Sequence, residues 1–254
     1  MTRIMISGCN GKMGQVVTAM CAQRDGIEVV AGVDVHAVKQ NDYPVYADPM
    51  ECPEEVDCVV DFSNPAALPS LLAYCKKSGS AIVLATTGYS EAQQQLICEA
   101  AKELRIFRSA NMSLGINVLM ALVQQAAKVL GDTCDIEIVE KHHNRKLDAP
   151  SGTALMIADA AAASLPQKPE YVYERHSVRQ QRSKQEIGIS SVRGGTIVGE
   201  HEILFAGTDE VLEIKHTAYS REIFANGAIK AAQFLASRTA PGLYNMEDLV
   251  SEVV

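Results

Sequence analysis

The sequence predicts an α/β protein of two domains, in which a parallel sheet flanked by helices precedes an α+β domain. Strand-like and helix-like stretches alternate over residues 4–107, which is typical of a parallel sheet with crossover helices. Three strand-like segments then follow one another within residues 186–217, which indicates a largely antiparallel or mixed sheet. A last helix-like stretch could return to the first domain. We therefore predict one domain of residues 1–113 with 221–254 and another of residues 114–220.

Composition limits the class of protein. The chain has 254 residues, of which 47% are hydrophobic and 21% charged, as expected of a globular protein with a sizeable core. A net charge of −8 argues against nucleic-acid binding, which requires clustered Lys and Arg. The seven cysteines form no C-x-x-C pair, which favours reduced thiols over a metal site. No signal peptide or membrane-length apolar run is visible, so we expect a cytoplasmic protein that binds no membrane.

The chain begins with one βαβ unit. A strand-like segment at residues 4–6 leads into a glycine loop at residues 8–14, and apolar residues then recur at helical spacing. A second strand-like run at residues 27–33 is followed directly by Asp34. Strand, glycine loop, helix, strand and terminal acid are the parts of a dinucleotide-binding unit.

The glycines are spaced G-x-x-G-x-x-G, which departs from the commoner G-x-G-x-x-G. The physical needs are the same: a tight turn, close approach of the backbone to a pyrophosphate, and close packing of helix on strand. Asp34 lies twenty residues after Gly14, about where an acid accepts hydrogen bonds from an adenosine ribose. We predict that a dinucleotide binds to Asp34 and to the loop residues Gly8, Cys9, Asn10, Gly11, Lys12 and Met13.

Further strands are predicted at residues 56–62, 81–85 and 105–107, with helices up to residue 77 and over residues 91–104. Ligands of parallel sheets bind at the carboxyl ends of the strands. Small and polar residues fall at those ends, namely Thr86, Thr87, Ala110, Asn111 and Ser113. Each one alone is typical of a turn or a helix cap, but together they predict a nicotinamide pocket.

The second domain begins with a predicted helix at residues 115–130 and a strand that ends near Lys141. Because Pro150 disfavours helix at the preceding residue, we expect the next helix to start after it, over residues 154–163, with Ser151 as its N-cap. We predict an irregular segment at residues 164–184, strands at residues 186–191, 197–205 and 211–217, and a final helix at residues 221–237.

The densest group of chemically active side chains lies between that strand and that helix. The loop contains His142, His143, Arg145 and Lys146. The amides of Gly152 and Thr153 open the helix, and a helix N-terminus attracts a carboxylate or phosphate. His142 and Lys146 can also exchange protons, so the loop could bind a small anion and protonate it. Arg193 and His201 are weaker candidates for the same pocket, and we interpret the basic run at residues 175–184 as a solvated loop or a subunit contact.

The segment from Glu140 to Ala154 reads E-x-H-H-x-x-K-x-D-A-P-S-G-T-A. At every position written, it resembles the signature of the dihydrodipicolinate (4-hydroxy-tetrahydrodipicolinate) reductase family. The resemblance extends through the glycine loop, Ala-Thr-Thr-Gly at 85–88, Ala-Asn-Met-Ser at 110–113, and segments 193–201 and 224–228. It therefore covers the whole chain.

The resemblance implies a Rossmann domain, rejoined by the C-terminal helix, and a sheet-rich domain for substrate binding and tetramerisation. The implied reaction reduces the cyclic dicarboxylate formed from aspartate semialdehyde and pyruvate to tetrahydrodipicolinate, with loss of water, using NADH or NADPH. It belongs to lysine biosynthesis via diaminopimelate. Either His142 or Lys146 would protonate the ring. Lys146, with His143, Ser151, Gly152 and Thr153, would hold one carboxylate, and Ala85 and Met112 complete the two nicotinamide motifs.

The chain departs from the family pattern at two places. Val35 and His36 follow Asp34 where relatives of wide cofactor tolerance have arginine, which predicts a preference for NADH. Lys12 could still meet a 2′-phosphate, so NADPH stays possible. Ala85 stands where glycine is usual. The alternatives are another amino-acid dehydrogenase, which has no reason to contain the His-His-x-x-Lys motif, and a nucleotide sensor, which needs no proton donor.

Overall fold

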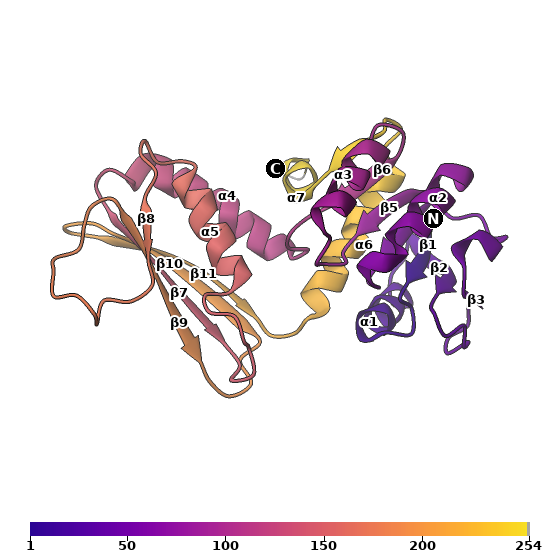
Figure 1. The fold of residues 1–254 in the computed structure, drawn as a ribbon, viewed down its shortest axis with the longest axis horizontal. Coiled ribbons are helices and arrows are strands. Elements are labelled where there is room, and N and C mark those ends of the chain that lie inside the picture. Colours follow the sequence, from indigo (N-terminus) through magenta and orange to yellow (C-terminus); the bar gives the residue numbers. More distant parts are fainter. Residues whose placement is uncertain (253–254) are drawn as a thin grey trace. The chain divides into compact units, whose positions relative to one another are not determined.

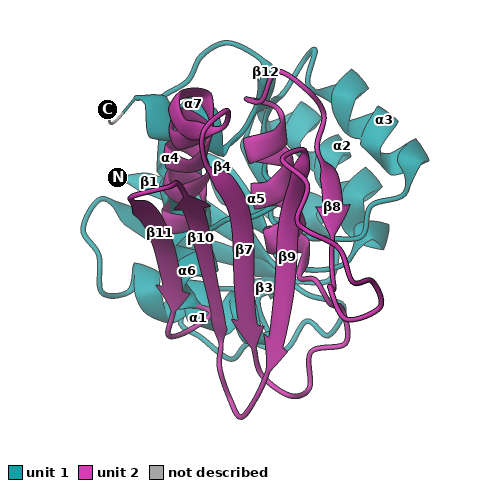
Figure 2. Ribbon diagram, turned by 90° about the vertical axis from the view of Figure 1, so that its left-hand side faces the viewer, with its two compact units in different colours: residues 1–114, 222–254 teal, residues 115–221 magenta. Residues whose placement is uncertain are grey.

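A computed structural model describes residues 1–252, and the chain divides into two compact units. The first unit comprises residues 1–114 and the chain from residue 222 onward, and the second comprises residues 115–221 (Figure 2). No helix within residues 1–252 is both long enough and apolar enough to span a membrane.

The first unit is built on a seven-stranded sheet in the order β12-β6-β5-β4-β1-β2-β3, and all of its strand pairs are parallel. Its strands are β1 (Thr2–Ser7), β2 (Ile27–Val33), β3 (Val45–Tyr46), β4 (Cys58–Asp61), β5 (Ala81–Leu84), β6 (Arg105–Arg108) and β12 (Gly242–Tyr244). The chain proceeds outward from β1 to β2 and then crosses to β4 on the other side. This reversal creates a switch point next to the carboxyl end of β1, where doubly wound sheets bind their ligands. The predicted α/β class is confirmed.

Helices cover both faces of this sheet (Figure 1). They are α1 (Lys12–Cys21), α2 (Leu68–Ser78), α3 (Glu91–Ala100), α6 (Glu222–Ala236) and α7 (Met246–Ser251), with short 3-10 helices η1 (Pro49–Glu51) and η2 (Pro65–Ala67). One core cluster unites α1 and α6 with the sheet, and the other unites α2 and α3 with the opposite face.

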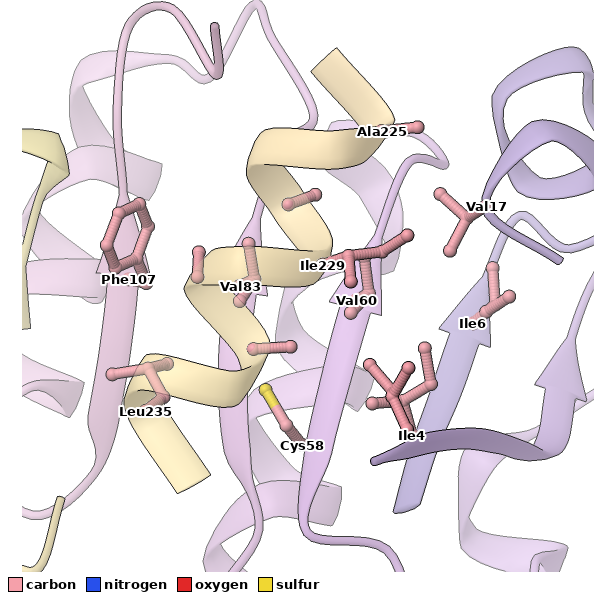
Figure 3. Close-up of a cluster of buried hydrophobic side chains, with 14 of the residues drawn as sticks. Ile4, Ile6, Val17, Cys58, Val60, Val83, Phe107, Ala225, Ile229 and Leu235 are labelled. Atoms are coloured by element: carbon pink, nitrogen blue, oxygen red, sulfur yellow. The ribbon is translucent and has the colours of Figure 1, made fainter. Parts of the chain in front are cut away.

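Helix α6 lies across the middle of the sheet, where Ile229 faces Val60 of β4 (Figure 3). Its buried face is rich in alanine, which brings the helix backbone close to the strands. A Cβ on Gly227 would lie 1.7 Å from the carbonyl oxygen of Met112. Such close packing ties the C-terminal segment to the first unit.

The second unit contains a five-stranded mixed sheet in the order β11-β10-β7-β9-β8. Its elements are α4 (Leu114–Leu130), β7 (Asp135–His142), α5 (Gly152–Ala162), β8 (Glu170–Val172), β9 (Glu186–Arg193), β10 (Gly199–Ala206) and β11 (Val211–Ala218). Burial alternates strictly along β7, and Ile136 and Ile138 pack with residues of α4 and α5. Glu140 and His142 continue the same buried row, so they lie on the helix-covered face. Figure 2 views the other face, which no helix of residues 115–221 covers.

Several predicted elements have different bounds or were missed. The segment at 164–184 was predicted to be irregular, which is wrong at β8, where Glu170–Val172 pairs with β9. The elements β3, β12 and α7 were not predicted. These elements are two to six residues long, too short for a periodic pattern, and their strands form only because a neighbouring strand offers a free edge. Helix α3 ends at Ala100 rather than at residue 104.

Candidate active site

The glycine loop joins β1 to α1 by a turn that excludes side chains at two positions. Gly8 has φ +77°, and a Cβ there would lie 2.8 Å from the carbonyl oxygen of Phe62. A Cβ on Gly14 would lie 2.3 Å from the carbonyl oxygen of Gly8, so the first turn of α1 packs directly on the loop backbone. The loop stands at the carboxyl end of β1, beside the switch point. This arrangement fits the close backbone approach that a pyrophosphate requires.

The structure brings Asp34 to this loop. The Asp34 carboxylate accepts hydrogen bonds from the backbone N–H of Asn10 at 3.1 Å and of His36 at 3.2 Å. The next residue, Val35, is 87% exposed. Cys9 is fully buried, and burial raises the pKa of its thiol to about 11. Only its backbone can therefore face a cofactor.

A cavity of about 550 Å³ lies at the carboxyl ends of β5 and β6. It is lined by Thr86, Thr87, Gly88, Tyr89, Arg108, Ser109, Ala110, Leu243 and Asn245. The hydroxyl oxygen of Thr86 is buried and has no hydrogen-bond partner within residues 1–252. The cavity therefore unites three of the predicted residues, Thr86, Thr87 and Ala110.

The other predicted residues of this edge do not line the cavity. Met112 and Ser113 are buried, and the Asn111 side-chain oxygen accepts the Ser113 N–H at 2.8 Å. Asn111 and Ser113 therefore shape the loop after β6.

Four lining residues were not predicted: Tyr89, Arg108, Leu243 and Asn245. The guanidinium carbon of Arg108 lies 5.7 Å from the centre of the Tyr89 ring. Leu243 and Asn245 reach the cavity only because β12 pairs with β6, so no local pattern could identify them.

In the second unit, His142 ends β7 with its ring buried. Its Nδ1 lies 2.6 Å from the carboxylate of Glu140, and its ring is 5.3 Å from that of His201. Its Nε2 faces Gly199, where a Cβ would lie 3.0 Å away. Burial lowers the pKa of His142, and the charges of Lys146 and Arg193 act in the same direction against the opposing effect of Glu140.

Glu140 is fully buried and accepts hydrogen bonds from two other segments besides its contact with His142. The Arg193 guanidinium donates to both carboxylate oxygens, at 2.7 and 2.8 Å, and the backbone N–H of Ser151 donates at 3.1 Å. Burial alone would raise the pKa of Glu140, but the hydrogen bonds from Arg193, Ser191 and His142 bring it down to about 2. The residue is therefore a carboxylate at neutral pH.

Ser151 begins α5 as predicted, because its hydroxyl accepts the N–H of Ala154 at 3.1 Å. The same hydroxyl lies 3.0 Å from Nε2 of His201. Burial, followed by the charge of His142, lowers the pKa of His201 to about 4, so His201 is neutral at pH 7. Gly152 and Thr153 form the first turn of α5, where the helix dipole favours an anion.

Lys146 and His143 lie on the loop between His142 and α5. The Lys146 ammonium forms a 2.9 Å ion pair with Asp148, and its side chain is 21% exposed. Nδ1 of His143 is buried without a hydrogen-bond partner in residues 1–252. The second unit therefore brings the predicted cluster together with the weaker candidates Arg193 and His201, and adds Glu140 of β7. Glu140 is the first residue of the signature, but no role was predicted for it, because a carboxylate in an alternating strand is usually exposed.

Arginines of the basic run at 175–184 form ion pairs within the second unit. Arg175 and Arg182 both bond to Glu137, at 2.6 and 3.0 Å. No group of three or more potential metal ligands occurs in the part of the chain that the structure describes, and all seven cysteines are free.

Replacing Gly199 with alanine is expected to lower kcat by about 10- to 100-fold, because the new methyl group would press on Nε2 of His142 and displace the ring. Steady-state kinetics would measure this loss. Gly194→Ala is the matched control in the connection between β9 and β10, since a Cβ there meets no atom within 4 Å. Equal activities of the two variants would contradict the expected crowding.

Comparisons with known proteins agree with this geometry. The family model described as "Dihydrodipicolinate reductase, N-terminus" matches residues 2–112, and "Dihydrodipicolinate reductase, C-terminus" matches residues 115–250. The chain is 57% identical over 252 residues to the 4-hydroxy-tetrahydrodipicolinate reductase of Caldanaerobacter subterraneus subsp. tengcongensis, covering 99% of each chain. It is 49% identical to that of Clostridium tetani, over 99% of this chain and 98% of the relative.

A solved structure is similar over nearly the full length. The dipicolinate-bound dihydrodipicolinate reductase from Paenisporosarcina sp. TG-14 has a TM-score of 0.81 and 25% identity, covering 96% of this chain and 97% of that one. Matches to both halves of the family and to full-length relatives confirm the resemblance that the Glu140–Ala154 segment predicted. This chain belongs to the dihydrodipicolinate reductase family.

Proposed function

We propose that this protein reduces (2S,4S)-4-hydroxy-2,3,4,5-tetrahydrodipicolinate to tetrahydrodipicolinate with NAD(P)H and loss of water, in lysine biosynthesis via diaminopimelate. The main support is the cluster of His142, Lys146 and the α5 N-terminus in a chain that is 57% identical to a reductase of this name. The chain is thus an oxidoreductase whose substrate is a small molecule.

The residues of the first unit fit a dinucleotide. Gly8 and Gly14 leave no room for side chains in the loop, Asp34 is fixed beside Asn10, and Thr86 and Thr87 line a cavity at the same sheet edge. When bound, the cofactor supplies a hydride to the substrate ring. In this proposal the loop from Gly8 to Met13 and Asp34 hold the adenosine and pyrophosphate. The residues at 85–87 and 110–113 form the nicotinamide pocket, which Thr86, Thr87 and Ala110 line while Asn111 and Ser113 shape its loop.

The second unit would bind the substrate and form the oligomer. One substrate carboxylate is held by the N–H groups of Gly152 and Thr153, the hydroxyls of Ser151 and Thr153, the Lys146 ammonium and His143. Hydride addition leaves electron density on the neighbouring ring carbon, which must receive a proton. Lys146 and His142 are the two groups here that can donate one. Burial of His142 favours its neutral form and so adds weight to Lys146.

We further propose that NADH is preferred over NADPH. Asp34 would repel a 2′-phosphate, and Val35, which is 87% exposed, offers that phosphate no positive charge. Lys12 lies in the first turn of α1 and leaves turnover with NADPH possible.

The open face of the five-stranded sheet supports a homotetramer, because an uncovered sheet face is a natural subunit contact. The seven free cysteines support a cytoplasmic location.

Asp34→Ala is expected to weaken NADH binding by about 1.5–3 kcal/mol, the range for a hydrogen bond to a charged group, while substrate KM stays near normal. NADPH binding should change less, because the repulsion of its phosphate is lost as well. Fluorescence titration with both nucleotides measures this difference. Glu28→Ala, which removes an exposed acid of β2, the strand that ends directly before Asp34, is the control. An unchanged NADH affinity would refute the ribose assignment.

The decisive experiment measures NADH and NADPH oxidation with the heterocycle generated in place from pyruvate and aspartate semialdehyde by the preceding synthase. Oxidation that depends on the heterocycle and is faster with NADH supports both the reaction and the cofactor preference. Faster oxidation with NADPH would retain the reaction and overturn the preference. Tight nucleotide binding without oxidation would instead identify a nucleotide sensor.

A further inference from the structure

Glu140 links the separate parts of the second-unit site. One of its carboxylate oxygens, Oε2, lies 2.6 Å from Nδ1 of His142 and accepts from Arg193 at 2.8 Å. The other, Oε1, accepts from Arg193 at 2.7 Å and from the Ser151 N–H at 3.1 Å. Arg193 also donates to the backbone oxygen of Asp148, at 2.6 Å. The fully buried carboxylate thus connects β7, β9, the loop and the start of α5.

We propose that Glu140 is a positioning residue which, held by Arg193, fixes the ring and tautomer of His142 and the anion-binding start of α5. The proposal rests on the proposed function, because it names the group that prepares the same site for the same reaction. Glu140 does not itself touch the substrate in this role.

The tautomer follows from the partners. An ionised carboxylate only accepts hydrogen bonds, so Nδ1 of neutral His142 must be the donor, and Nε2 is left without a proton. The Glu140 carboxylate cannot rotate away from the His142 ring, because the Arg193 guanidinium donates to both of its oxygens in a bidentate pair. His142 therefore presents an unprotonated Nε2 on the side of Gly199 in its neutral form and an N–H donor there only when it is cationic.

Replacing Glu140 with glutamine has a specific consequence for this tautomer. The new NH₂ group cannot take the position of Oε1, because the N–H groups of Arg193 and Ser151 both point at it. At the position of Oε2 it meets one fixed donor, from Arg193, and the Nδ1 of His142, which can become an acceptor. The amide then donates to Nδ1, and neutral His142 must move its proton to Nε2.

Two positive groups act on the charge of His142 against Glu140, and two further histidines lie near it. Arg193 on β9 and Lys146 on the loop are positive, and His201 on β10, with His216 beside it on β11, completes the row across the sheet. Glu140 favours the cationic ring, whereas Arg193 disfavours it. Removing one or the other should therefore shift the pKa of His142 in opposite directions.

The test is NMR of the full-length protein with ¹⁵N-labelled histidine, recorded across pH, together with steady-state kinetics. We expect Glu140→Gln to convert neutral His142 from the Nδ1–H to the Nε2–H form and to lower its pKa by about 1 or more. We expect kcat to fall about 100-fold with a smaller rise in substrate KM, because the ring is misplaced while Ser151 keeps an acceptor. The matched control is Glu137→Gln, a carboxylate on the same strand that also pairs with arginine but lies on the opposite sheet face.

Arg193→Gln is the second variant, and it keeps the proposal testable if Glu140→Gln fails to fold. It should retain the Nδ1–H tautomer and raise the pKa of His142, since a positive charge is removed and Glu140 is freed to interact with the ring. A mere loosening of the site would expose His142 and raise its pKa in both variants. Unchanged tautomer and pKa in Glu140→Gln, or the same direction of shift in both variants, would overturn the proposal. The NMR readout needs no turnover, so it stays informative if the wild-type protein proves to reduce a different substrate.

Discussion

Lys146→Ala is expected to lower kcat by about 10²- to 10⁴-fold, the range for loss of a general acid, while NADH affinity stays near normal. The physical reason is that Lys146 can serve the reaction twice, as a positive charge for a substrate carboxylate and as a proton donor. Its ammonium is held by Asp148 at 2.9 Å, so the charge is already placed in the loop before the substrate arrives. Steady-state kinetics and NADH titration of the variant measure the two quantities separately.

Lys141→Ala is the matched control for this variant. Lys141 is also ion-paired, to Glu200 at 3.4 Å, but it projects from the opposite face of β7. It should retain normal turnover. Wild-type activity in Lys146→Ala would remove Lys146 from the mechanism and leave His142 as the proton donor.

Gly14→Ala should have the largest effect on the first unit. The added Cβ would lie 2.3 Å from the carbonyl oxygen of Gly8 and 2.7 Å from Cα of Cys9, and backbone atoms cannot give way as a flexible side chain can. We expect the free energy of unfolding to fall by about 3 kcal/mol, the upper range for overpacking, and NADH binding to weaken because the loop must move. Chemical denaturation and NADH titration measure these changes.

Gly11→Ala is the control in the same loop. Its Cβ would meet a single atom, the Gly8 carbonyl oxygen, at 3.2 Å, so a small shift can accommodate it. If Gly14→Ala has the same free energy of unfolding and the same affinity for NADH as the wild type, the loop is not packed as tightly as the structure indicates.

Much of the first unit could be predicted because its information is local. The glycine loop, the period of α1 and the position of Asp34 follow from residues within one βαβ unit. The N-cap at Ser151 was predictable for the same reason, since a cap depends on its immediate neighbours. The strands missed by the sequence analysis, β3, β8 and β12, contain two or three residues each and owe their existence to a partner strand.

The sequence by itself determined the α/β class, the family and the cluster between Glu140 and Ala154. Periodicity and a contiguous signature can be recognised in the sequence even when the distant contacts are not known. Only the tertiary structure decided which side chains meet across strands. It placed Arg193, 53 residues from Glu140 in the chain, on the carboxylate that holds His142. It also brought β12 beside β6, which adds Leu243 to the cavity near Thr86. Strand register and sheet order determine these contacts between distant residues. Both depend on packing in the folded core and not on any local run of residues.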